Sequence, residues 1–165
     1  MHSTSSRAAT SISPAISAQV SEFAPSRNQT LLWVDDSRTL LSLYKSVFEN
    51  LGFAVCTTSS PREALRHAST NKTDSAIDVA ILDYEMPEMN GGELAHLLRF
   101  QHPSLPIILY SSSTCIPASV NDSVDAVCVK GAPRQELLAT IEWLSGDPSR
   151  TIGERPSVST PSSNH

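Results

Sequence analysis

Residues 77–82 form an almost uninterrupted apolar run that stops at the carboxylate of Asp83. A short aliphatic run bounded by turn residues is typical of a strand buried on both faces, as in a parallel sheet. Asp83 would then stand at the carboxyl end of that strand, where open α/β sheets bind their ligands. The Asn-Gly-Gly turn at residues 90–92 indicates that the chain then bends into a helix.

A second apolar run, residues 31–34, ends in the same way, at Asp35 and Asp36. If the two strands are parallel neighbours, these carboxylates and that of Asp83 converge at one edge of the sheet. Carboxylates crowded together raise one another's pKa unless a cation neutralises them. An oxygen-only cluster of this kind suits a hard ion such as Mg²⁺.

The remaining pattern alternates strands with helices, which predicts a doubly wound α/β fold. Right-handed crossovers give (βα)5 topology with a five-stranded parallel sheet in the flavodoxin-like order 2-1-3-4-5 and three α/β/α layers. The expected strands are 31–34, 53–58, 77–82, 105–110 and 126–130, and the expected helices are 37–51, one beginning near 61, 92–101 and 133–144. Residues 112–125 predict only a short or irregular fourth helix, and Ser60-Pro-Arg-Glu63 predicts a capping box at the second.

Composition bounds the domain organisation. The 165 residues are 39% hydrophobic, which is enough for one packed domain, expected over residues 29–145. The Ser-rich and Pro-containing flanks, 1–28 and 146–165, predict disordered arms. The net charge of −5 argues against a nucleic-acid surface. No apolar stretch approaches the ~20 residues that span a bilayer, so no membrane insertion and a cytoplasmic location are expected.

The chain resembles the receiver domain of bacterial two-component response regulators. In that family an acidic pair follows the first strand, a phospho-accepting Asp the third, a Ser or Thr the fourth and a Lys the fifth. This sequence has the acidic pair at 35–36, then Asp83, Ser111 and Lys130 in that order. The resemblance covers residues 29–145 and implies a single-domain, non-enzymatic signalling protein.

The resemblance also implies a role for each matching residue. Asp83 would accept the phosphoryl group, with Lys130 and Ser111 contacting Asp83 or the phosphoryl oxygens. Mg²⁺ would be bound by the side chains of Asp35, Asp36 and Asp83 and the backbone carbonyl of Glu85. The phosphoryl donor would be a sensor histidine kinase or a phosphotransfer protein. An unidentified downstream protein would bind the last helices and the fifth strand.

Four further positions matter for the resemblance: two lie where the family tunes dephosphorylation, and two depart from the family pattern. Glu85 and Ser113 occupy positions that tend to tune dephosphorylation. Val127 stands at the switch position, where switching members usually carry Tyr or Phe, and Gly131 replaces the proline that usually follows the lysine. These departures leave open a pseudo-receiver that binds partners without being phosphorylated. A phosphatase with an aspartyl-phosphate intermediate is a weaker alternative, because its second Asp is here Glu85. A nucleotide or flavin binder lacks the Gly-rich loop.

Overall fold

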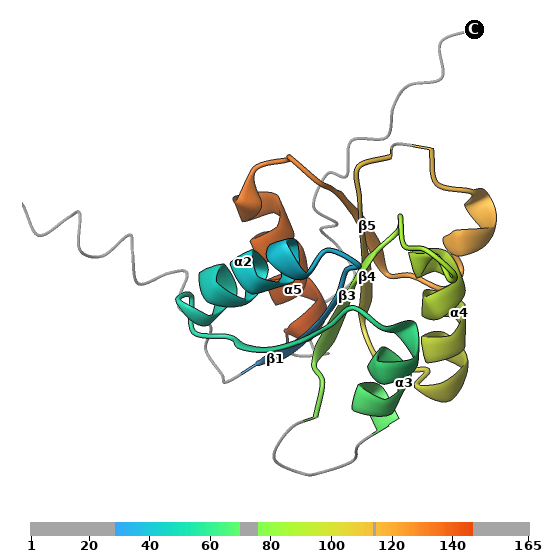
Figure 1. Ribbon diagram of the computed structural model, residues 1–165, viewed down its shortest axis with the longest axis horizontal. Helices are drawn as coiled ribbons and strands as arrows, with labels where there is room; N and C mark the ends of the chain where they lie inside the picture. Colours follow the sequence, from blue (N-terminus) through green and yellow to red (C-terminus); the bar gives the residue numbers. More distant parts are fainter. Residues whose placement is uncertain (1–28, 70–75, 114, 147–165) are drawn as a thin grey trace, which may run out of the picture.

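The computed structural model describes residues 29–69, 76–113 and 115–146. Within them, one parallel sheet has the strand order β2-β1-β3-β4-β5, as the sequence predicts (Figure 1). The strands are β1 (Thr30–Val34), β2 (Ala54–Thr58), β3 (Val79–Asp83), β4 (Ile107–Ser111) and β5 (Ala126–Val129). The central strand β3 is buried along its whole length, which explains why its sequence is apolar rather than alternating.

Helices cover both faces of the sheet and complete the three layers (Figure 1). The helices are α2 (Arg38–Glu49), α3 (Pro61–Ser69), α4 (Gly91–Gln101) and α5 (Arg134–Ser145). One core lies under α2 and α5 and contains Trp33, Phe48 and Ile141. The other lies under α3 and α4, where Leu82 and Leu94 are packed. Alternate residues of each strand therefore feed opposite cores.

The segment between β4 and β5 contains a single 3-10 turn, η2 (Ala118–Val120), in place of a full fourth helix. This confirms the short or irregular element that the sequence predicts. Val120 packs so closely on α4 that a Cβ at Gly92 would lie 2.8 Å from its methyl group. The Arg99 guanidinium also bonds Asp125, whose carboxylate accepts the N–H of Ile107 at 2.7 Å. These contacts fix the segment although its helical hydrogen bonds are limited to those of a short 3-10 turn.

The helix starts follow the predicted chemistry with one correction. Asn90 and Glu93 form a capping box at α4, and Ser37 caps α2. The predicted capping box at α3 is only half formed. Ser60 Oγ accepts the N–H of Glu63 at 3.4 Å, but the Glu63 carboxylate accepts the Thr58 hydroxyl at 2.8 Å instead of reaching back to Ser60. A nearby hydroxyl at the end of β2 outcompetes the main-chain donor.

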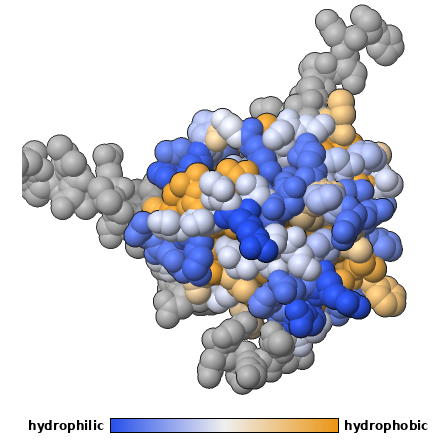
Figure 2. Space-filling model, in the orientation of Figure 1, coloured by the Kyte–Doolittle hydropathy of each residue, from blue (hydrophilic) through white to orange (hydrophobic). Residues whose placement is uncertain are grey.

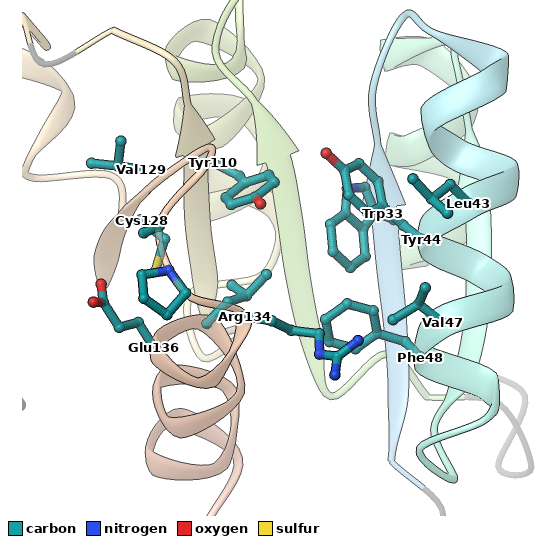
Figure 3. Close-up of a pocket in the computed structure, with 13 residues that line it drawn as sticks. Trp33, Leu43, Tyr44, Val47, Phe48, Tyr110, Cys128, Val129, Arg134 and Glu136 are labelled. Atoms are coloured by element: carbon teal, nitrogen blue, oxygen red, sulfur yellow. The ribbon is translucent and has the colours of Figure 1, made fainter.

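An apolar groove with a cavity volume of about 180 Å³ lies between α2 and α5. Its floor is the stacked pair Trp33 and Tyr44, with ring centroids 4.3 Å apart, and the ring of Tyr110 meets both edge-on (Figure 3). Figure 2 shows hydrophobic residues at the surface in this region, amid a mostly polar face. The groove adjoins the lysine that follows β5, because the Lys130 ammonium lies 5.9 Å from the Tyr110 ring centroid.

In the part of the chain that the structure describes, no helix is long and apolar enough to cross a membrane. Every helix and strand that the structure describes lies between residues 30 and 145. The predicted arms, residues 1–28 and almost all of 146–165, lie outside the described residues.

Candidate functional site: an acidic edge of the sheet

Three carboxylates meet at the carboxyl edge of the sheet. Because β1 pairs with β3 in a register that places Val34 beside Leu82, the residues that follow these positions are neighbours. One carboxylate oxygen from each of Asp35, Asp36 and Asp83 lies within 4.8 Å of the others. Asp35 and Asp83 are buried, whereas Asp36 is exposed. The convergence predicted from the sequence is therefore what the structure contains.

Lys130 neutralises part of this charge. Its ammonium lies 2.9 Å from Asp83 Oδ1 and 3.1 Å from Asp35 Oδ2. The N–H of Lys130 donates to the carbonyl of Ser111 at 2.8 Å, which extends the β4–β5 pairing by one step and aims the side chain at the acids. Gly131 follows with φ of +92°, and none of the described peptide bonds is cis. A glycine in the left-handed region thus turns the chain where the family usually has proline.

The surroundings of Asp83 and Lys130 raise the pKa values of both groups. Burial raises the pKa of Asp83, and the charge of Asp35 adds to the rise, while Lys130 opposes it without cancelling it. For Lys130, burial acts to lower the pKa, but the hydrogen bonds and charges of Asp83 and Asp35 outweigh burial and raise it. One ammonium among three carboxylates leaves an excess of negative charge that attracts a cation.

Ser111 and Glu85 meet across the ends of β3 and β4. Ser111 is the last residue of β4 and is fully buried, and its hydroxyl donates to Glu85 Oε1 at 3.1 Å. The N–H of Glu85 donates to Asp83 Oδ1 at 3.1 Å, which anchors Glu85 beside that carboxylate. The N–H of Ser113 donates to Glu85 Oε1 at 3.1 Å. The two predicted tuning positions therefore contact each other.

Close backbone packing holds the loop after β3 against the site. A Cβ at Gly91 would overlap the main-chain oxygen of Asp83, so only glycine fits where α4 begins. Val127 is half-buried and packs against the core under α3 and α4. The residue at the predicted switch position is therefore a core aliphatic side chain.

Two groups at this site were not predicted from the sequence. The N–H of Ser112 donates to Glu85 Oε2 at 3.4 Å, and the ring of Tyr110 lies beside the Lys130 ammonium. A main-chain donor leaves no signal in a residue pattern. Tyr110 could have been noticed from its position directly before Ser111.

Comparison with known proteins identifies the class that this fold and site define. Residues 31–142 match the model of the response regulator receiver domain. The chain belongs to this family, which is a signalling module of two-component systems.

Individual relatives agree with this assignment. The response regulator SaeR of Staphylococcus aureus is 33% identical over 84 residues, which are 51% of this chain and 35% of the relative. The chain thus spans about a third of that protein. The response regulator TrrA of Thermotoga maritima, solved in complex with Mg²⁺ and BeF, has a TM-score of 0.62 and 26% identity over 70% of this chain and 98% of that one. TrrA was also solved with the histidine kinase ThkA, in a structure with 28% identity and a TM-score of 0.62 over 70% of this chain and 97% of the matched one.

Proposed function

We propose that this receiver domain accepts a phosphoryl group on Asp83 in a Mg²⁺-dependent reaction and signals by binding a partner protein. The observation that carries the proposal is the Lys130 ammonium bridging Asp35 and Asp83 beside a third carboxylate. This arrangement combines a carboxylate nucleophile with a fixed cation. Phosphoryl transfer needs little more than positioning and charge stabilisation.

In the proposed reaction, an oxygen of Asp83 attacks phosphorus and forms a new O–P bond, while the N–P bond to the donor histidine breaks. The imidazole leaves with the bonding electron pair, and a proton from solvent neutralises it. Asp83 Oδ1 already accepts hydrogen bonds from Lys130 and from the N–H of Glu85, so we assign the attack to Oδ2. Lys130 and the Ser111 hydroxyl would stabilise charge on the transferred group.

The donor set fits Mg²⁺, because the three clustered side chains offer only oxygen ligands and carry more negative charge than Lys130 neutralises. Asp35, Asp36, Asp83 and the backbone carbonyl of Glu85 would hold the ion. When bound, it would screen the negative charge of the carboxylates and the phosphoryl group. It would also leave Lys130 in place, since the ammonium reaches the acids from β5.

A histidine kinase or a phosphotransfer protein is the proposed donor, and the complex of TrrA with a histidine kinase supports this choice. The proposed partner surface comprises β5 and the last helix. β5 is an edge strand of the sheet, and Val129 on β5 and Trp143 on α5 are 43% and 41% exposed. Because η2 replaces a full helix next to this edge, the surface differs in shape from one with a fourth helix.

The test is mass spectrometry after incubation with acetyl phosphate, with Mg²⁺ or with a chelator. We expect a gain of one phosphoryl group that requires Mg²⁺ and is absent in Asp83→Asn. Asp122→Asn is the matched control, because it removes one exposed carboxylate from the loop after η2 and should gain the group normally. A gain in Asp83→Asn equal to that of the wild type would refute the assignment.

A pseudo-receiver is the second candidate, favoured by one observation. The Ser111 hydroxyl, which would contact the phosphoryl group, is already bonded to the Glu85 carboxylate. If this bond is permanent, the domain binds partners in one fixed state. No phosphoryl gain in the wild type, with the fold intact by circular dichroism, would select this candidate.

A further inference from the structure

The Glu85 carboxylate sits in a cradle of three donors at the end of β4. The Ser111 hydroxyl and the N–H of Ser113 both donate to Oε1 at 3.1 Å, and the N–H of Ser112 donates to Oε2 at 3.4 Å. The N–H of Ser113 also donates to the Ser111 oxygen at 2.9 Å, which holds the three-residue cradle in shape. A side chain from the loop after β3 thus crosses to the loop after β4.

The cradle is built to hold an anion. All three groups that face Glu85 donate hydrogen bonds. A hydrogen bond to a carboxylate is stronger than one to a neutral acceptor. Each oxygen of the Glu85 carboxylate therefore accepts at least one hydrogen bond in the cradle.

The cradle lies next to the end of β3, where a phosphoryl group on Asp83 would be attached. β3 and β4 are paired, with Asp83 beside Tyr110, so the cradle begins one residue further along the neighbouring strand. A phosphoryl group brings three acceptor oxygens and a charge of roughly −1.5 to −2. Two anions repel each other across one set of donors. A phosphoryl group that used these donors would therefore exclude Glu85 from them.

We propose that the Glu85 carboxylate is an internal competitor for the phosphoryl group: it fills the Ser111–Ser113 cradle in the resting domain and is displaced when Asp83 is phosphorylated. This inference rests on the proposed function. Glu85 is exposed, so its side chain can swing into solvent without disturbing either core. Its N–H stays bonded to Asp83, which confines the change to the side chain.

The displacement gives this chain a switch that does not need an aromatic ring at Val127. In the resting state the cradle is closed by Glu85, and in the phosphorylated state a negative charge is released onto the surface beside the loop after β4. A ligand shifts such an equilibrium only as far as it binds one state better than the other. Because Glu85 closes the cradle in most resting domains, the apparent affinity for a phosphoryl group or its analogue is reduced in proportion to the fraction of domains that are open.

The first test measures binding of beryllofluoride, a phosphoryl analogue, in the presence of Mg²⁺ by calorimetry. Glu85→Ala keeps the backbone carbonyl and removes the competitor, so we expect it to bind about tenfold more tightly than the wild type. Glu88→Ala is the control, because Glu88 is an exposed glutamate of the same loop and its removal changes the net charge equally. We expect at most a twofold effect there.

The second test needs neither metal nor phosphoryl group. Amide hydrogen exchange by NMR in a chelator should show faster exchange at Ser112 and Ser113 in Glu85→Ala than in the wild type, and no change in Glu88→Ala. Unchanged exchange in Glu85→Ala would overturn the inference.

The binding outcomes separate the two proposals. Equal affinity of Glu85→Ala and the wild type, or an equal gain in Glu88→Ala, would overturn the competition and leave the proposed function standing. Absence of beryllofluoride binding in all three proteins would refute the proposed function, and the competition with it.

Discussion

Removing the charge of Asp83 should stabilise the resting domain, although it breaks an ion pair. At an effective dielectric constant of about 20, the Lys130 ammonium at 2.9 Å attracts Asp83 by about 6 kcal/mol. Asp35, whose carboxylate lies within 4.8 Å, repels it by at least about 3.5 kcal/mol. The difference of about 2 kcal/mol is smaller than the several kcal/mol that removing a carboxylate from water costs.

The ionised Asp83 is therefore unfavourable on balance, in agreement with its raised pKa, to which burial is the largest contribution. In Asp83→Asn the side-chain oxygen can still accept from Lys130 and from the N–H of Glu85. Lys130 also keeps Asp35 as a partner, so no buried charge is left unpaired. We expect the free energy of unfolding to rise by about 1 kcal/mol, which corresponds to roughly 3–6 °C in Tm for a domain of this size.

The assay is thermal and urea unfolding by circular dichroism at pH 7 in a chelator, with Asp122→Asn as a charge-matched control that should change little. Adding Mg²⁺ at ten times its dissociation constant should stabilise the wild type by about 1.4 kcal/mol and Asp83→Asn by much less. The difference in the free energy of unfolding between Asp83→Asn and the wild type should then become smaller or change sign. If Asp83→Asn is less stable than the wild type in the chelator, the desolvation argument is wrong.

Three further changes test other parts of the structure. Gly91→Ala should destabilise the domain by about 3 kcal/mol in urea unfolding, because the new Cβ overlaps the main chain of Asp83; unchanged stability would contradict that packing. Burial raises the pKa of Tyr44 to about 12, against about 10 in the unfolded chain, so unfolded chains lose this proton first and stability should fall as pH rises above about 10. Curves at pH 9 to 12 check this, and Tyr44→Phe should flatten the slope. With Ellman's reagent at pH 8, exposed Cys115 should react first, because burial raises the pKa of Cys128; equal rates would exclude this difference.

The sequence was sufficient for the fold because the apolar runs are short, clear and end in charged or turn residues. A strand buried on both faces cannot tolerate a charge in its middle, so the positions of Asp35 and Asp83 marked the strand ends. Parallel pairing then required the two acids to meet. The family resemblance added Ser111 and Lys130, which the structure places beside the same edge.

The hydrogen-bond partner of a side chain that has several donors within reach could not be predicted in the same way. Glu63 prefers the Thr58 hydroxyl to the predicted backbone donor, and Glu85 crosses to another loop. Both outcomes depend on distances between segments that are far apart in the sequence. Likewise, the position of the Lys130 amine depends on the bond from its N–H to the Ser111 carbonyl, which joins segments that are far apart in the sequence.

One quantity, the excess negative charge at this edge, links the stability of the domain to its proposed chemistry. Asp35, Asp36 and Asp83 lie close together, and the Lys130 ammonium that contacts Asp35 and Asp83 neutralises only part of their charge, so the resting domain is under electrostatic strain that a cation relieves. A substitution that removes one of the three clustered charges of Asp35, Asp36 and Asp83 should raise the stability of the resting fold and weaken Mg²⁺ binding together. Loss of packing would instead lower stability. Opposite signs in the two measurements therefore distinguish an electrostatic role from a structural one at each of these positions.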